Sequence, residues 1–373
     1  MKPFKQGFSG SFKTIFSTKP LFSTLILAVI LYGFFYPAAY KSQVASQLPI
    51  VVVNQDQSQL SQQIVQRVAL LRAVQVVQQT SNFAEAEQMV RNHQADAIFM
   101  INPNLQASLL HGDTGGISLY LSGAYLIRTK EIGKGLADTI KDSIVNGADP
   151  LLKSLYIDAA VPVESIVLYN PTGGYGDYIF PAVSTLIVHQ TLILGVGMLV
   201  GLYRQQRYRF NIGNLLGISL AFMLIGCCSC LYYFGFVFWL QDYPRGQNML
   251  GSLVAVPIYV FAVVMLAIWL GSLFDRPERV AQVLTFSSLP LFFLSGASWP
   301  LEAMPHWMAT LAWCLPSTAG VRQFIQLNQM GASLIDVLPN LLILLAIGLL
   351  CMLLGFRRLI KMNKETLAAY NEK

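Results

Sequence analysis

Long apolar segments are the dominant pattern of this chain, and their spacing predicts its architecture. One segment lies near the N-terminus, and the others are crowded into the second half, after a long stretch of mixed polarity. A bilayer core about 30 Å thick requires roughly 20 apolar residues per crossing helix. The predicted spans are residues 20–40, 177–202, 213–240, 249–274, 280–298 and 336–356. We therefore expect an α-helical polytopic membrane protein with six transmembrane helices.

The stretch between the first two spans, residues 41–176, has the pattern of a soluble domain. Short apolar runs predict strands at 49–53, 73–77, 95–101, 117–121 and 166–168. Helical spacing of apolar residues predicts helices at 58–71, 83–92, 103–110 and 124–156. Ser81 or Asn82 would cap the second of these helices. Because strands and helices alternate, we expect an inserted α/β domain with parallel strand pairing.

Lysine and arginine are concentrated on one side of the predicted spans, which predicts their orientation. The basic residues on that side are Lys2, Lys5, Lys13, Lys19, Arg204, Arg207, Arg209, Arg276, Arg279, Arg357, Arg358, Lys361, Lys364 and Lys373. The short loops of the opposite side hold Arg245 and Arg322. Because positively charged flanks remain in the cytoplasm, both termini, including the tail 357–373, are expected there, with 41–176 outside. No A-x-A site closes the first apolar run, so an uncleaved anchor is favoured over a signal peptide.

Residues 1–19 predict a helix that lies in the membrane interface. The apolar residues Phe4, Phe8, Phe12, Ile15 and Phe16 have helical spacing, and Lys5 and Lys13 lie off that face. An apolar face opposite basic side chains is typical of a helix lying flat on a bilayer. A disordered cytoplasmic tail is the alternative interpretation.

Composition supports the membrane assignment and excludes several classes of protein. Hydrophobic residues make up 54% and charged residues 12% of the chain, against about 25% charged in soluble domains. The net charge of +6 is spread along span flanks, so it does not predict a nucleic-acid-binding face. None of the five cysteines lies in 41–176, so no disulfide framework is expected there. Cys227, Cys228 and Cys230 lie within one span without an accompanying His, Asp or Glu, which predicts packing rather than metal binding.

The sequence contains no motif for catalysis or nucleotide binding. It has no G-x-S-x-G elbow, no H-E-x-x-H and no Walker A motif, G-x-x-x-x-G-K-[ST]. We therefore expect no cofactor in this chain and no enzymatic activity of its own. If transport is driven by ATP, the nucleotide binds a partner subunit.

Residues 290–322 combine helix breakers with aromatic residues that favour the membrane interface. Prolines lie at 300, 305 and 316, and tryptophans at 299, 307 and 313. This combination predicts a re-entrant segment near 299–320 within the 177–356 membrane region. An ordinary outer loop with aromatic anchors is the alternative.

The same stretch resembles the signature of ABC-2 type permeases. The matching residues are Leu294, Ser295, Gly296, Pro300, Met304, Pro305, Trp307, Leu315, Pro316 and Arg322. Residues 51–68, 95–103 and 169–171 resemble further family patterns, so the likeness extends over nearly the whole chain. The resemblance implies a bacterial inner-membrane subunit in which two six-helix halves pair, through a second copy or a sibling permease. It also implies a separate cytoplasmic ATPase and is compatible with a periplasmic adaptor and an outer-membrane channel.

One departure from the family bears on coupling to the ATPase. Many members have an acidic E-x-G-T segment between helices two and three, whereas residues 203–214 here are short and basic. The residues proposed to couple to the ATPase are Arg204, Arg207, Arg209, Asp275, Arg276, Glu278 and Arg279. The alternative is that the three arginines of the loop only anchor the topology.

His189 is the one ionisable side chain well inside the second predicted span. Intramembrane polar residues are functional candidates, so packing, substrate contact and a proton role all remain open for it. Gly195, Gly197 and Gly201 on the same span would permit close helix approach.

The function favoured is the permease of an exporter that moves an unidentified substrate out of the cytoplasm or inner membrane. A sensor or scaffold is a weaker alternative, because no sizeable cytoplasmic segment is predicted. An ion-coupled transporter would need carboxylates inside the spans, and Asp177, Asp242, Asp275 and Glu278 all lie at span ends.

The predicted topology is testable by cysteine labelling in intact cells, in a variant whose native cysteines are replaced. Because basic flanks set the orientation, Tyr120→Cys should react with an impermeant thiol reagent. Gln206→Cys and Glu365→Cys should react only after permeabilisation. Labelling of position 120 from the inside would overturn the orientation.

Overall fold

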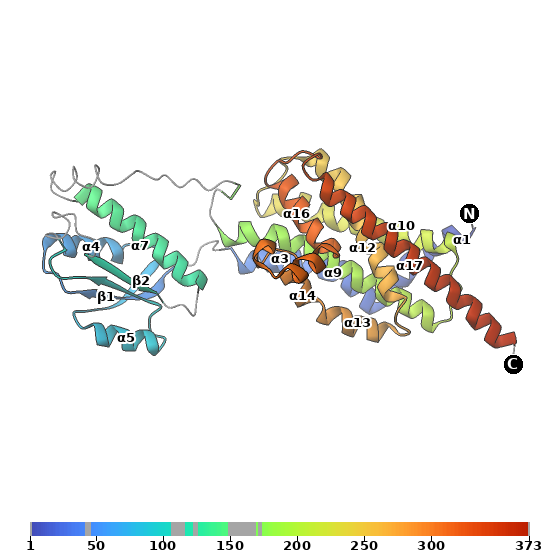
Figure 1. The fold of residues 1–373 in the computed structure, drawn as a ribbon, viewed down its shortest axis with the longest axis horizontal. Helices are drawn as coiled ribbons and strands as arrows, with labels where there is room; N and C mark the ends of the chain where they lie inside the picture. Colours follow the sequence, from blue (N-terminus) through green and yellow to red (C-terminus); the bar gives the residue numbers. More distant parts are fainter. Residues whose placement is uncertain are drawn as a thin grey trace. The chain divides into compact units, whose positions relative to one another are not determined.

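The computed structural model describes residues 2–41, 46–105, 116–121, 126–147, 169–170 and 174–371. The chain divides into two compact units. One comprises Met1–Lys41 with Leu168–Lys373, and the other Ser42–Val167. Figure 1 shows a bundle of helices in the first unit and a sheet with helices in the second.

The helical unit contains five helices, within the described residues, that are long and apolar enough to cross a membrane. They are Lys19–Ala39, Tyr175–Gln205, Ile212–Leu240, Met249–Gly271 and Leu338–Met362. The first long helix consists of α2 (Lys19–Phe22), η1 (Ser23–Leu27) and α3 (Ala28–Ala39), and the third consists of α10 (Ile212–Leu231), η2 (Tyr232–Val237) and α11 (Phe238–Leu240). The second is α9 (Tyr175–Gln205) and the fourth is α12 (Met249–Gly271). The fifth is the first part of α17 (Leu338–Asn371). Five of the six predicted spans thus correspond to long helices.

The sixth predicted span, 280–298, is not a continuous helix. Helix α13 (Pro277–Phe286) ends at Ser287, and α14 (Ser288–Leu294) follows it. Pro290 has no N–H to donate to the carbonyl of Phe286, and the hydroxyls of Ser287 and Ser288 bond to local carbonyls, each at 2.7 Å. Six continuous transmembrane helices are therefore not confirmed.

Three short helices follow α14 in the described chain: η3 (Leu301–Ala303), α15 (His306–Trp313) and α16 (Pro316–Asn328).

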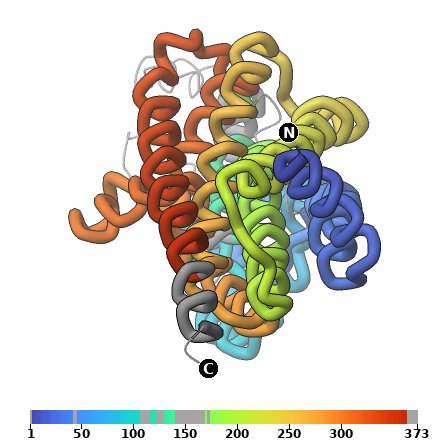
Figure 2. The backbone as a smooth tube through the Cα atoms, turned by 90° about the vertical axis from the view of Figure 1, so that its right-hand side faces the viewer, coloured from blue at the N-terminus to red at the C-terminus, as the bar shows by residue number. Residues whose placement is uncertain are grey.

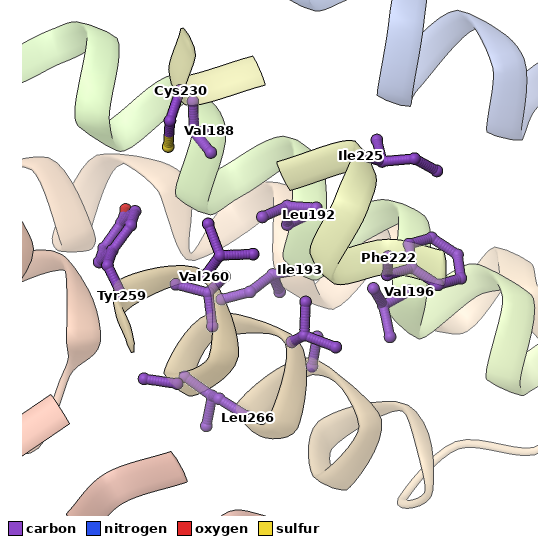
Figure 3. Packing of buried hydrophobic residues seen from close by; sticks show 14 of the residues in the cluster. Val188, Leu192, Ile193, Val196, Phe222, Ile225, Cys230, Tyr259, Val260 and Leu266 are labelled. Atoms are coloured by element: carbon purple, nitrogen blue, oxygen red, sulfur yellow. The ribbon is translucent and has the colours of Figure 1, made fainter. Parts of the chain in front are cut away.

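Helix α9 lies at the centre of the unit, and most of its length is buried. Figure 3 shows Leu192 and Val196 of α9 among Phe222 and Ile225 of α10 and Val260 of α12. Lipid tails are as apolar as these side chains, so association depends on close packing rather than on release from water. Glycines allow that packing along α9, because a Cβ on Gly197 would lie 2.7 Å from Val280 of α13.

The N-terminal helix α1 (Lys2–Ser17) packs on α10 through small residues. Its buried residues are Gly7, Ser11 and Ile15, whereas Phe4 and Phe16 are 39% and 64% exposed. Figure 2 shows these blue N-terminal helices on the outside of the bundle. The predicted helix therefore forms, with Phe4 and Phe16 exposed while Phe8 and Phe12 are half-buried and Ile15, from the same predicted face, is buried. Its position in a membrane interface stays a prediction.

The second unit contains a four-stranded sheet in the order β2-β1-β3-β4. The strands are β1 (Leu48–Asn54), β2 (Val74–Thr80), β3 (Ala97–Ile101) and β4 (Ile117–Leu121). Strand β1 is parallel to both β2 and β3, but β4 is antiparallel to β3. The expectation of purely parallel pairing is wrong for β4. The N–H of Asn102 donates to the carbonyl of Gly116 at 3.0 Å, so the chain re-enters the sheet where β3 leaves it.

Helices cover both faces of this sheet, as Figure 1 shows for α4 and α7 on one side and α5 on the other. The helices are α4 (Gln59–Ala69), α5 (Phe83–Arg91) and α7 (Leu126–Gly147). Alternate residues of β1 follow the two faces: Ile50 and Val52 pack with α4 and α7, and Val51 and Val53 with α5. Asn82, one of the two predicted caps, accepts from the N–H of Ala84. The helix predicted at 103–110, the end of that at 124–156 and the strand at 166–168 lie largely outside the described residues.

The contact between α1 and α10 can be tested with two glycines on α1. A Cβ on Gly7 would lie 2.2 Å from the carbonyl oxygen of Asn214, whereas a Cβ on Gly10 has its nearest neighbour, the Tyr203 hydroxyl, at 3.8 Å. We expect Gly7→Ala to destabilise the protein by about 1–3 kcal/mol through overpacking. Gly10→Ala should be neutral or slightly stabilising because alanine favours helix. Thermal unfolding in detergent measures both, and equal behaviour would contradict the close contact.

Candidate functional site

The C-terminal ends of α9 and α12 and the start of α13 meet at one place, which we call the basic end. A Cβ on Gly201 of α9 would lie 3.0 Å from the nitrogen of Pro277 in α13. The guanidinium of Arg204 donates to the carbonyl of Ser272, at 2.9 Å, and also to that of Phe274. Of the predicted coupling residues, Arg204 is thus brought against the turn that leads to Asp275 and Arg276.

Arg204 is a structural clamp rather than an exposed charge at the basic end. The two carbonyls that it binds follow the last residue of α12, where helix carbonyls lack intrahelical partners and carry partial negative charge. The Nε of Arg358 on α17 donates to the same Ser272 carbonyl at 3.0 Å. Two arginines from different helices therefore cap α12. Sequence reasoning used Arg358 only for topology, and its pairing with Arg204 carried no local signal.

Arg207 and Arg209 lie on the turn between α9 and α10, and both are exposed. Arg207 has a φ of 54°, which helps the chain to reverse. The side chains of Asn211 and Asn214 form a reciprocal cap at the start of α10, and Asn214 also donates to the carbonyl of Arg209 at 2.8 Å. The backbone of this turn is thus fixed while its guanidinium groups face outward.

The turn before α13 presents the remaining predicted coupling residues. Arg279 and Asp275 form an ion pair at 3.0 Å, with 61% and 53% of the two side chains exposed. Such an exposed pair contributes at most about 1 kcal/mol. Arg276 is the N-cap residue of α13, and it and Glu278 are exposed. Charges of both signs therefore surround the basic end.

The residues of the predicted family signature mark boundaries of the short helices. Gly296 has a φ of +81° and follows α14. Pro300 and Pro305 are the N-cap residues of η3 and α15, and Pro316 occupies the first turn of α16, where its missing N–H costs no hydrogen bond. Arg322 of α16 lies 3.9 Å from the Glu302 carboxylate.

The Arg322 guanidinium also lies over the ring of Trp313, 5.6 Å from its centroid. This arginine therefore connects α16 to both η3 and α15. The glycine and the prolines of the signature thus set the ends of the short helices, and Arg322 contacts residues of the neighbouring short helices.

Helix α16 lies antiparallel to α9. The Nε2 of Gln329, just past the end of α16, donates to the carbonyl of Asp177 near the start of α9, at 3.0 Å. Deeper in the unit, the Tyr259 hydroxyl donates to the carbonyl of Thr185 at 2.9 Å. A Cβ on Gly320 would lie 2.3 Å from the ring of that tyrosine. The N-terminal half of α16 is thus level with the middle of α9.

Buried polar side chains without partners occur in these two helices. His189 of α9 is 1% exposed, and neither ring nitrogen has a hydrogen-bond partner among the described residues. The same holds for the hydroxyl of Ser317 and the amide of Gln323 on α16. An unsatisfied buried polar group costs about 1–3 kcal/mol. Within the described part of the chain, no three His, Cys, Asp or Glu side chains gather as a metal site would require.

Comparison with known protein families identifies the chain. A family model described as "ABC-2 family transporter protein" matches residues 19–357, the greater part of the sequence. The chain belongs to the ABC-2 transporter family. A search of curated proteins found no match to it. Family membership confirms the resemblance seen in the sequence and makes the chain a multi-pass membrane component of an ABC-type transporter, which implies an ATPase partner.

The clamp formed by Arg204 leads to a prediction that separates it from its neighbours in this ABC-2 permease. Lysine keeps the charge but lacks the planar fork that reaches two carbonyls. Arg204→Lys should therefore lose stability, by about 1.5–3 kcal/mol if both charged hydrogen bonds are lost. Arg207→Lys and Arg209→Lys should change stability by less than about 0.5 kcal/mol. Thermal unfolding of the three purified variants is the measurement, and an unchanged Arg204→Lys protein would refute the clamp.

Proposed function

We propose that this chain is the membrane-spanning permease subunit of an ABC exporter. It moves a substrate out of the cytoplasm or inner membrane, using ATP hydrolysed by a separate cytoplasmic subunit. The observation that carries the proposal is the family match over residues 19–357, which includes the first four long helices and most of the apolar part of the fifth. The lack of a Walker A motif in this sequence supports an ATPase on another polypeptide.

The ATPase binds the basic end in this proposal, so this end and both termini face the cytoplasm of a bacterial cell. Unit Ser42–Val167 is then periplasmic, where an adaptor and an outer-membrane channel are its possible partners. The sixth crossing is made by α13 and α14, and residues near 299–320 form the re-entrant segment. Short helices separated by proline suit this role, because irregular backbone at membrane depth is tolerated only inside protein.

The exposed charges of the basic end are the ATPase contact, and the buried contacts beneath them transmit its movement. Arg207, Arg209 and Arg276 are exposed and would pair with carboxylates of the ATPase. The turn that holds Arg276 touches α9 at Gly201, and Arg204 binds the same turn through Phe274. A displacement of the turn would therefore move α9 and α12 together.

Two permease copies, or this chain and a sibling, form the complete pathway. The described helices comprise five long crossings and a broken segment, which is half of the two-part arrangement typical of the family. Closed two-fold pairing is the commonest way to enclose such a pathway.

The decisive experiment is purification of the tagged full-length chain from its native membrane. We expect a complex that contains an ABC ATPase and two permease chains by native mass spectrometry, with ATP hydrolysis that depends on the assembled complex. Recovery of the chain without any ATPase under conditions that keep other ABC complexes intact would overturn the proposed function. A single permease chain per active complex would overturn the pairing.

The contact at the basic end is tested in the same complex with the double variant Arg207→Lys/Arg209→Lys. Because lysine retains the charge that sets topology but not bidentate pairing, we expect normal insertion with a loss of ATP hydrolysis. Arg91→Lys, an exposed arginine of the other unit, is the matched control. Wild-type hydrolysis in the double variant would remove this loop from the coupling.

A further inference from the structure

A lateral groove lies between α1, the first long helix and α10. Its volume is about 330 Å³, at the lower end of the range of about 300–1,000 Å³ for ligand pockets. Its lining is mostly apolar and includes Phe12 of α1, Leu25 and Ile26 of η1, Leu224 and Cys228 of α10, and Tyr232 of η2. Helix α1 and the first long helix follow one another in the sequence, α10 is remote from both, and Figure 2 shows the blue N-terminal helices beside the bundle.

Direct contacts tie each wall of the groove to a neighbouring helix and so set the spacing of the walls. The hydroxyls of Tyr232 and Tyr233 donate to the carbonyls of Ile30 and Val29, at 3.1 Å and 2.7 Å. On the opposite side Leu25 is packed against α9, where a Cβ on Gly195 would lie 2.4 Å from it. The first long helix is thus tied to α9 and to η2 at different heights, and it cannot move to close the gap without breaking one of these contacts.

Two π-helical segments contribute to the lining. Leu25 and Ile26 belong to η1, and Tyr232 is the first residue of η2. Wide π turns are rare, and they occur mostly as single turns at functional sites. The two facing helices each have a π-helical segment at this groove, and this observation does not depend on the measured cavity. It indicates that the groove is a feature of the fold rather than a packing defect.

The groove opens toward the surface that faces lipid. Ile30 and Leu224, which line it, are 46% and 45% exposed. In a membrane-spanning chain such a surface meets acyl chains, so the occupant enters from the bilayer. An acyl chain also matches the mostly apolar lining of the groove.

Two exposed lysines are close in sequence to lining residues of the groove. Lys13 follows Phe12, and Lys19 begins the helix that supplies Leu25. Basic side chains next to a membrane attract anionic headgroups. An anionic headgroup above an apolar channel is the arrangement of an acidic phospholipid.

We propose that this groove binds one acyl chain of an anionic phospholipid of the surrounding membrane, whose headgroup is held by Lys13 and Lys19. The site is distinct from the basic end, and the proposal rests only on the membrane-spanning character of the chain. Bound lipid would fill the space between α1 and the first long helix and so link the position of α1 to the lipid composition.

The test uses the full complex in vesicles of phosphatidylcholine and phosphatidylglycerol, with a phosphatidylglycerol that carries a diazirine in its acyl chain. After illumination, mass spectrometry should place the label on the residues that line the groove. Unlabelled phosphatidylglycerol should compete better than phosphatidylcholine. Replacing Lys13 and Lys19 by glutamine should abolish that preference.

Two tryptophan variants on α10 provide a matched pair. Leu224→Trp fills the groove and should reduce labelling to the background level, whereas Leu220→Trp, one turn away, 40% exposed and not part of the lining, should leave it unchanged. If the first variant fails to fold, the competition between the two lipids in the unaltered complex still decides. Even labelling around α10 without lipid preference would overturn the proposal, as would cross-linking of the groove residues to a second permease chain.

Discussion

The structure of the helical unit depends on α9, which has to hold its neighbours without help from the hydrophobic effect. Inside a bilayer, apolar helices gain nothing by leaving lipid, so close packing and interhelical hydrogen bonds determine the arrangement. Helix α9 supplies the packing through glycines: Gly195 admits Leu25, Gly197 admits Val280, and Gly201 admits the start of α13. Larger residues at any of these positions would separate elements that are remote in sequence.

In several hydrogen bonds between elements of this unit, a polar side chain donates to a backbone carbonyl of another element. Tyr259 binds the carbonyl of Thr185, Gln190 that of Leu284 at 2.5 Å, and Tyr178 that of Ala297 at 2.7 Å. A carbonyl can accept a second hydrogen bond without losing its helical one. Side chains of this kind therefore join helices while every helix keeps its own backbone bonds, which the interior of a membrane requires.

Both halves of α9 are held by contacts with other helices. At one end of α9, Arg204 ties the helix to the residues that follow α12. Along its other half, α9 packs on α16, where His189, Ser317 and Gln323 are buried without partners in the described structure. Each of these unsatisfied polar groups lowers the stability of the packing. Helix α9 thus joins the exposed charges of the basic end to a band of buried polar side chains.

Much of this architecture was determined by the sequence alone, because long apolar runs and regular periodicity are local properties. The five long helices, the α1 helix and the buried strand β1 follow directly from such patterns. The ABC-2 family was also recognisable from residues 290–322. The prolines and Gly296 of this stretch set helix boundaries through their own backbone geometry, which does not depend on how the helices pack.

Other features were decided by the tertiary structure. The break at Ser287 lies inside a strongly apolar run, where the effect of Pro290 depends on whether neighbouring groups satisfy the backbone. The face of α1 that meets α10 is the glycine face, because backbone approach at Gly7 and Gly217 is closer than phenylalanine would allow. Strand β4 pairs antiparallel to β3, and the bond from the Asn102 N–H to the Gly116 carbonyl continues that pairing beyond Ile101. Arg204 became a clamp only when folding brought the end of α12 within reach, since no pattern around position 204 encodes a partner at position 272.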